Sequence, residues 1–148
     1  EMFRKLNEHL LHTLSEDMFM TCSCVELDAE KTQATLYNAG LANILIFRNG
    51  KIIHKEPSSF VPRGLMDVPD NPATIHPIQK DDRIIMYTDG FEEATNPSGK
   101  MFGEERFDLL LEQTISADKP LMFLLEEVAR FHQGDAMEDD ITLVELTC

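Results

Sequence analysis

The chain has 148 residues, of which 27 are Asp or Glu and 13 are Lys or Arg, so its formal net charge is −14. This length is typical of one domain, and a hydrophobic content of 43% is enough to form a core, which argues against disorder. The acidity argues against a nucleic-acid binder and against docking on anionic membranes, because both kinds of partner are bound by basic surfaces.

The sequence also lacks the signals of a membrane or secreted protein. No stretch approaches the ~18–20 consecutive apolar residues that a membrane-spanning helix needs, and the first residues show no signal peptide. The chain has three cysteines. Cys22 and Cys24 are too close for an ordinary disulfide, and reduced thiols fit best. We therefore expect a cytoplasmic protein whose residues 1–148 belong to one domain.

The hydrophobic pattern predicts a helix followed by a series of strands. Apolar residues recur at helical spacing over residues 2–14, whereas residues 18–27 alternate between two faces as in a strand. Asn49-Gly50 is the strongest short signal for a β-hairpin, because both residues tolerate a positive φ. Prolines within residues 56–72 predict a loop. Further strands are expected at residues 33–38, 44–47, 51–54, 74–78, 83–88 and 141–146.

Helical spacing returns after Gly90. Residues 104–114 form one expected helix, and Ser116 or Asp118 is a candidate cap for a second helix that Gly134 would end with left-handed backbone. The order is a helix, a long run of locally pairing strands, two helices and a last strand. It predicts an α+β fold of mainly antiparallel sheets with helices packed outside.

Two acidic positions stand out because each lies at the mouth of an apolar strand. Asp89 follows the strand at residues 83–87, and Asp139 and Asp140 precede the strand at residues 141–146. If the strands lie side by side, Asp89 and Asp139 meet, and a cation between them would relieve their repulsion. Oxygen ligands favour Mg²⁺, Mn²⁺ or Ca²⁺. The alternative is that these residues are ordinary turn acids, since Asp-Gly is a common turn pair.

The segment around Asp89 resembles a motif of a known family. Residues 82–94 are similar to the D-x-x-x-x-Y-T-D-G-x-x-E-A segment of the metal-dependent, PPM-type (protein phosphatase 2C-like) protein phosphatases, in their bacterial SpoIIE/RsbU group. Further segments resemble motifs of this family in the family's order. They are Asn38-Ala39-Gly40, Pro62-Arg63-Gly64-Leu65, residues 96–107 with N-x-x-G-x-x-F-G-x-x-R, and Asp139-Asp140-Ile141-Thr142.

The resemblance implies an α-β-β-α sandwich and a protein serine/threonine phosphatase. In that family two Mn²⁺ or Mg²⁺ ions activate a water that attacks the phosphorus of phosphoserine or phosphothreonine. By this resemblance Asp89 and Asp139 are catalytic metal ligands, and Gly90 lets the backbone pass close to the metal site. Asp140 is expected to lie next to the ligands and to support them without binding the metal directly.

The resemblance also implies a role in bacterial signal transduction. The expected partners are a phosphorylated regulator, such as an anti-anti-sigma (STAS) protein in sigma-factor regulation, and an upstream sensor or receiver domain. A homodimer is left open.

The departures from the family pattern define the competing hypothesis. The earlier family motifs, G-D-x-Y-D and D-x-x-G-H-G, do not occur here, and we expect them, with their strands and metal ligands, before residue 1. Residues 1–148 alone would then be an inactive part of the domain. Leu41 stands where the family has a His, and Arg63 where it has an apolar residue. The alternative is a pseudophosphatase that binds a partner without chemistry.

The remaining candidates are weaker. His9 and His12 are three residues apart on the first helix, but no third ligand is apparent. Glu92 and Glu93 are expected as solvated charges at the start of a helix. Most of the methionines at positions 66, 101, 122 and 137 are expected to fill the core, with adaptable partner contacts as the alternative.

Overall fold

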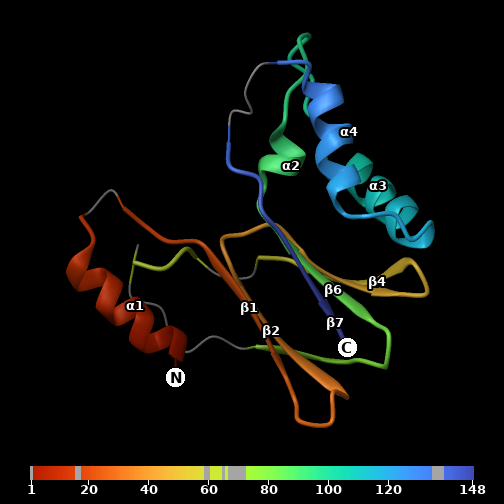
Figure 1. The fold of residues 1–148 in the computed structure, drawn as a ribbon. Coiled ribbons are helices and arrows are strands. Elements are labelled where there is room, and N and C mark those ends of the chain that lie inside the picture. Colours follow the sequence, from red (N-terminus) through yellow and green to blue (C-terminus); the bar gives the residue numbers. More distant parts are fainter. Residues whose placement is uncertain (1, 16–17, 59–60, 65, 67–72, 135–138) are drawn as a thin grey trace. The chain divides into compact units, whose positions relative to one another are not determined.

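The computed structural model describes all residues except 1, 16–17, 59–60, 65, 67–72 and 135–138 (Figure 1). The chain divides into two compact units, Glu1–Ile44 with Lys55–Asp81 and Cys148, and Leu45–His54 with Asp82–Thr147. The elements in chain order are α1 (Met2–Thr13), β1 (Cys22–Leu27), β2 (Gln33–Ala39), β3 (Ile44–Arg48), β4 (Lys51–Glu56), β5 (Thr74–Pro77), β6 (Arg83–Tyr87), α2 (Gly90–Glu93), α3 (Glu104–Ser116), α4 (Met122–His132) and β7 (Leu143–Thr147).

The first unit contains the three-stranded antiparallel sheet β1-β2-β5. β1 and β2 form the predicted hairpin, paired from Cys22 opposite Ala39 to Leu27 opposite Ala34. Asp28 fixes the turn, because its Oδ1 accepts the backbone N–H groups of Thr32 and Gln33, each at 2.7 Å. These hydrogen bonds, the one from Gln33 above all, lower the pKa of Asp28.

The predicted first helix is confirmed as α1, and one buried polar residue ties it to the loop before β5. Asn7 is 1% exposed. Its Nδ2 donates to the carbonyl of Met66 at 3.1 Å, and its Oδ1 accepts the N–H of Gly64 at 2.9 Å. In the same loop Arg63 is buried, with its guanidinium 5.8 Å from the ring centre of Phe3. The arginine that replaces an apolar family residue is therefore part of the packing of this unit.

The second unit contains the four-stranded sheet β4-β3-β6-β7. The predicted β3–β4 hairpin is confirmed, and its turn residues Asn49 and Gly50 have φ angles of 51° and 75°. β6 lies between β3 and β7 and is antiparallel to both. The apolar residues of β3 and β6 are buried, and Tyr87 at the end of β6 packs on Phe107 of α3 with ring centres 4.5 Å apart.

The expectation that the strands pair locally is wrong for β5 and β6. They are separated by a short turn, yet β5 pairs with β2 and β6 pairs with β3 and β7, so they belong to different sheets. Asp81 at the turn has a φ of 68°. The next residue, Asp82, is buried and binds Arg48 at the end of β3 through two hydrogen bonds of 2.9 and 2.8 Å. This ion pair holds the start of β6 beside β3.

Two expectations about the ends of α4 are also wrong. Ser116 is the last residue of α3, and its Oγ donates to the carbonyl of Gly50 at 3.1 Å. Oδ1 of Asp118 lies 3.6 Å from Nη2 of Arg83. Neither residue therefore caps α4. The left-handed residue at its C-terminus is Gln133, with a φ of 56°, and not Gly134. A Cβ atom on Gly134 would lie 2.4 Å from Nε2 of His132, so this glycine gives room to the imidazole.

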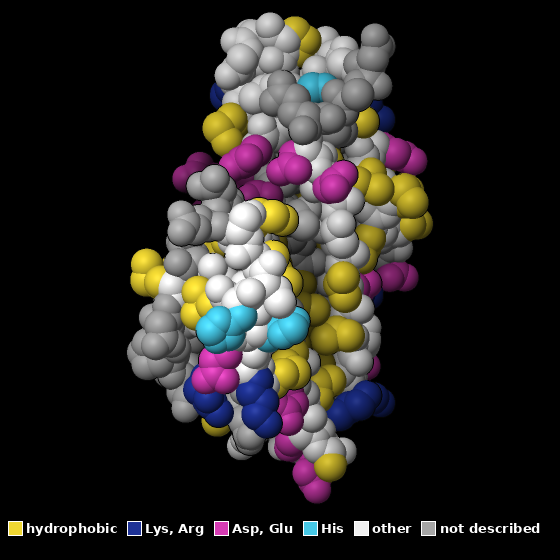
Figure 2. All heavy atoms as spheres, turned by 90° about the vertical axis from the view of Figure 1, so that its left-hand side faces the viewer, with side chains coloured by type: hydrophobic (Ala, Val, Ile, Leu, Met, Phe, Trp, Pro, Cys, Tyr) yellow, Lys and Arg dark blue, Asp and Glu magenta, His cyan; other side chains and the backbone are white. Residues whose placement is uncertain are grey.

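The fold class is confirmed as a mixture of helices and antiparallel sheets. Helices account for the start of the chain and for most of residues 90–132, and strands for the rest of the regular structure. Within the described residues no helix is both long and apolar enough to cross a bilayer. Figure 2 shows a group of acidic side chains in the upper half of the face that it draws, with no Lys or Arg side chain among them.

The Arg48–Asp82 pair generates a stability prediction. Asp82→Asn should lower the free energy of unfolding by about 1–3 kcal/mol, because it removes the charge from a buried partner of a two-bonded ion pair. Urea unfolding of the full chain measures the effect. The control is Glu8→Gln, which breaks the exposed Arg4–Glu8 pair on α1 and should cost less than about 0.5 kcal/mol. Equal costs for the two variants would contradict the role given to Asp82.

Candidate functional site

The sheet brings the two predicted acidic segments to the same edge. β6 and β7 are antiparallel, and Tyr87 at the end of β6 lies opposite Leu143 at the start of β7. The residues after β6 and before β7 therefore leave the sheet at the same end. The N–H of Thr88 donates to the carbonyl of Thr142 at 3.0 Å, which continues the pairing beyond the strands. The predicted neighbourhood of the Asp89 and Asp139 segments is confirmed.

The side chain of Thr88 clamps these two segments together. Its Oγ1 donates to the carbonyl of Asp140 at 2.9 Å and accepts the N–H of Thr142 at 2.9 Å. One hydroxyl thus satisfies two backbone groups on the opposite segment. This contact was not predicted, although Thr88 stands in the T-D-G motif.

Gly90 lies against the same backbone. A Cβ atom at this position would be 2.7 Å from the carbonyl oxygen of Asp140 and 3.2 Å from Cγ1 of Ile141. Only glycine fits there without a shift of the opposite segment. The close backbone approach expected for Gly90 is therefore an approach to Asp140, while its approach to a metal stays a prediction.

The carboxylates of both predicted ligands are exposed. Asp89 stands at the N-cap position of α2, but its side chain makes no capping hydrogen bond to that helix. Oδ1 of Asp139 accepts the N–H of Asp140 at 2.7 Å, which fixes the turn before β7. Asp140 is exposed as well and meets Thr88 through its backbone carbonyl. The metal roles of these three residues stay predictions.

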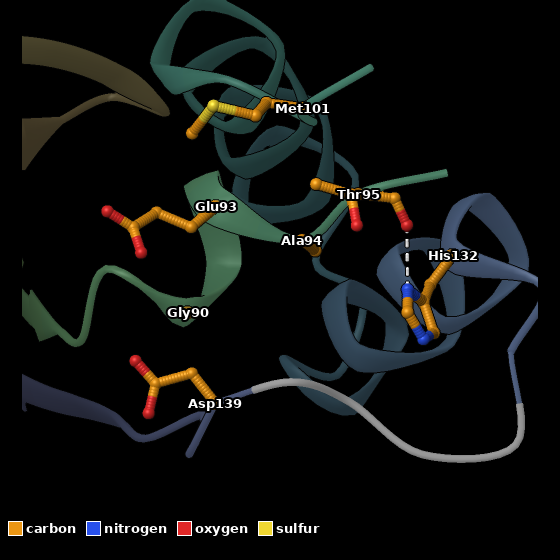
Figure 3. Close-up of a pocket in the computed structure, with 7 residues that line it drawn as sticks. All are labelled: Gly90, Glu93, Ala94, Thr95, Met101, His132 and Asp139. Carbon is orange, nitrogen blue, oxygen red and sulfur yellow. Dashed lines mark hydrogen bonds between the residues drawn. The ribbon is translucent and has the colours of Figure 1, made fainter. Parts of the chain in front are cut away.

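A pocket with a volume of about 340 Å³ lies beside this edge. Figure 3 shows the carboxylates of Glu93, from α2, and Asp139 extending to the same side of the pocket, with Gly90 between them. Glu93 is exposed in the first turn of α2, as predicted, but its place in the pocket was not predicted. The available signal was its spacing, since residues three apart on a helix lie on the same side and Glu93 follows Gly90 by three.

The far side of the pocket is built by the end of α4. Nδ1 of His132 lies 2.7 Å from the carbonyl of Thr95, which joins α4 to the segment after α2 (Figure 3). Ala94 and Met101 also line the pocket. Met101 is 50% exposed, and Met66 and Met122 are exposed too, so the expectation of core filling is wrong for these three. Met137 lies outside the described residues.

The donor set fits part of a site for a hard cation. Glu93 and Asp139 in the pocket, and Asp89 next to it, offer oxygen ligands of the kind that Mg²⁺ and Mn²⁺ prefer. Among the residues that the structure describes, however, no group of three or more His, Cys, Asp or Glu side chains is placed to hold a metal ion. His9 and His12 likewise belong to no such group among these residues. Water molecules or further oxygen ligands would have to complete the coordination of a cation bound here.

Comparisons with known proteins identify the kind of domain that carries this edge. The family model described as "Stage II sporulation protein E (SpoIIE)" matches residues 1–148. Protein IcfG of Synechocystis sp. is 28% identical over 130 residues, which are 86% of this chain and 20% of IcfG.

Two solved structures share the fold. The SiaA-PP2C domain of Pseudomonas aeruginosa matches with a TM-score of 0.78 and 20% identity, over 96% of this chain and 57% of that one. The structure of the PP2C phosphatase domain and a fragment of the regulatory domain of SpoIIE from Bacillus subtilis matches with a TM-score of 0.74 and 23% identity, over 96% of this chain and 42% of that one. The chain thus spans less than two thirds of the length of each of these relatives.

The Thr88 clamp generates a prediction that a matched pair of variants can test. Thr88→Val removes the hydroxyl that bonds to the N–H of Thr142 and to the carbonyl of Asp140. Because both hydrogen bonds are exposed and water can replace them, the free energy of unfolding should fall by about 0.5–1.5 kcal/mol. Thr88→Ser keeps the hydroxyl and should cost less than half as much. Urea unfolding of the full chain measures both. If the serine variant were as unstable as the valine variant, packing of the methyl group and not the clamp would be responsible.

Proposed function

The chain belongs to the SpoIIE family of PP2C-like phosphatase domains, and from this premise we propose that it contributes two ligands to the metal site of a protein serine/threonine phosphatase. The observation that carries the proposal is the pairing of β6 with β7, which places the Asp89 and Asp139 segments at one edge of the sheet. Like charges held at one edge are stabilised by a cation.

Each residue of the edge has a distinct task in this proposal. Asp89 and Asp139 bind Mn²⁺ or Mg²⁺, while Asp140 shapes the turn that presents Asp139. Thr88 and Gly90 keep the two segments in contact. When bound, the metal would neutralise phosphate charge and lower the pKa of the attacking water.

The remaining ligands are proposed to come from residues outside this sequence. Two features support this: the described residues hold no complete metal cluster, and the chain covers 57% of the SiaA-PP2C structure that it matches. We accordingly expect residues 1–148 alone to be inactive and the intact parent protein to carry the activity.

The proposed substrate is a phosphoserine or phosphothreonine of a bacterial signalling protein of the anti-anti-sigma type, acted on in the cytoplasm. The family resemblance of the motifs at residues 38–40, 62–65, 82–107 and 139–142 supports this choice. An upstream sensor or receiver domain would control the activity, and the active form could be a homodimer.

The second candidate is a pseudophosphatase, which binds a phosphoprotein without hydrolysing it. It is favoured by one sequence feature, Leu41 in place of the family His, and by the incomplete ligand set among the described residues. The two candidates differ in a single observable, the release of phosphate.

The test uses the intact parent protein with Mn²⁺ and a phosphorylated anti-anti-sigma protein. Asp89→Asn and Asp139→Asn should each reduce kcat/KM by at least about a hundredfold, because charge stabilisation worth several kcal/mol would be lost. The control is Asp118→Asn, an exposed acid near Arg83 that does not line the pocket and should leave turnover within about twofold.

Two outcomes would decide against the proposal. Unchanged turnover in both Asn variants would remove the metal roles from Asp89 and Asp139. Binding of the phosphoprotein by the parent, without release of phosphate at any Mn²⁺ or Mg²⁺ concentration, would support the pseudophosphatase.

A further inference from the structure

A second hollow, separate from the acidic edge, lies between α3 and α4. Its volume is about 440 Å³. On α3 it is lined by a stripe that includes Arg106, Leu109 and Gln113, at the three- and four-residue spacing that keeps side chains on one side of a helix. The core side of α3, with Phe107 and Leu111, is a different stripe. α3 therefore has a second partly apolar face, which we call the α3–α4 groove.

One arginine dominates the chemistry of the α3–α4 groove. The guanidinium of Arg106 lies 4.6 Å from the ring centre of Phe131, on α4, and 5.2 Å from that of Phe102. Two aromatic rings thus hold the side chain in place, and stacking of this kind leaves the N–H groups at the guanidinium edge able to donate. The other arginine of the groove, Arg130, is paired with Glu127.

Arg106 differs from the other lining cation because it forms no ion pair with the described residues. It is an exposed positive charge in a chain whose net charge is −14. Next to it Leu109 is 60% exposed. A fixed guanidinium beside an uncovered leucine matches a ligand that has a carboxylate next to an apolar group.

We propose that the α3–α4 groove binds an acidic and apolar segment of a partner protein, with a carboxylate of that segment on Arg106 and an apolar side chain on Leu109. Stripes on two adjacent helices are a common way to receive an amphipathic helix. The charge of the whole chain opposes a dianionic phosphate more strongly than a carboxylate, which favours the carboxylate. The proposal assigns a task to the arginine of the F-G-x-x-R motif, which the proposed metal chemistry does not use.

The probe is a short, fluorescently labelled peptide with Glu and Leu at helical spacing, and the protein is the intact chain without added metal. Fluorescence anisotropy gives Kd, and hydrogen exchange shows which segments become protected. We expect protection in α3 and α4, and weaker binding by at least about tenfold for a peptide with Gln in place of Glu, since charge-assisted hydrogen bonds are lost.

The variants make the test specific. Arg106→Gln should raise Kd about tenfold, Arg106→Lys less, and Leu109→Ser should also weaken binding while keeping the charge. The control is Lys119→Gln. Lys119 also lies over an aromatic ring, 3.9 Å from the centre of Phe123, but it does not line the groove, so Kd should not change. Urea unfolding verifies that each variant folds, and the Leu109 variant carries the test if an Arg106 variant does not.

Several results would overturn the proposal. The peptide could fail to bind at millimolar concentration, or hydrogen exchange could show protection outside α3 and α4. The Gln peptide could bind with the same Kd as the Glu peptide, or a phosphoserine peptide could bind more tightly than the Glu peptide. The chain could also associate with itself in a way that Arg106→Gln abolishes. The last result would make the groove an interface between two copies. Because no metal or phosphate release is involved, failure here leaves the proposed phosphatase activity untouched, and the reverse also holds.

Discussion

The candidate site depends on the antiparallel pairing of β6 with β7. The two strands are separated in sequence by the segment that contains α2, α3 and α4, so their pairing closes a long loop and must be stabilised by the sheet itself. The central position of β6 between β3 and β7 supplies that stabilisation, and the ion pair of Arg48 with the buried Asp82 holds the start of β6 beside β3. Beyond the strands, Thr88 continues the pairing with a side-chain hydroxyl. The Asp89 and Asp139 segments meet because of these contacts.

The same edge gathers exposed negative charge at the end of β6 and the start of β7. Exposed carboxylates near one another repel, and solvent screens that repulsion only in part. A hard cation would relieve this repulsion, with water molecules or further oxygen ligands completing its coordination. Thr88 and Gly90 add contacts instead of charge, since Thr88 bonds to the backbone of the opposite segment and Gly90 lets that backbone come close. The edge thus presents exposed carboxylates on two segments that hydrogen bonds of Thr88 join.

The two proposed surfaces use opposite electrostatics within one unit. The pocket beside Gly90 presents the carboxylates of Glu93 and Asp139, and the α3–α4 groove presents the guanidinium of Arg106. A partner with an acidic, apolar segment would meet attraction at the groove. At the pocket its phosphate would meet repulsion until a cation is bound. Such a division would separate recognition of the partner from the chemistry on its phosphate.

The sequence by itself determined the features that rest on local geometry. Asn49 and Gly50 form a hairpin turn because their backbone tolerates positive φ, and the helical spacing of apolar residues defines α1 and α3. The motif order indicated the family, and the positions of Asp89 and Asp139 at strand ends indicated a shared edge.

Only the tertiary structure decided the choices that depend on distant partners. It placed β5 and β6 in different sheets, buried Arg63, exposed Met101 and brought Glu93 into the pocket. It also placed the left-handed end of α4 at Gln133 and set Gly134 against the imidazole of His132. The physical reason is common to these cases. A periodic pattern specifies which side chains share a face, but the partner of that face is selected by packing between residues far apart in the chain.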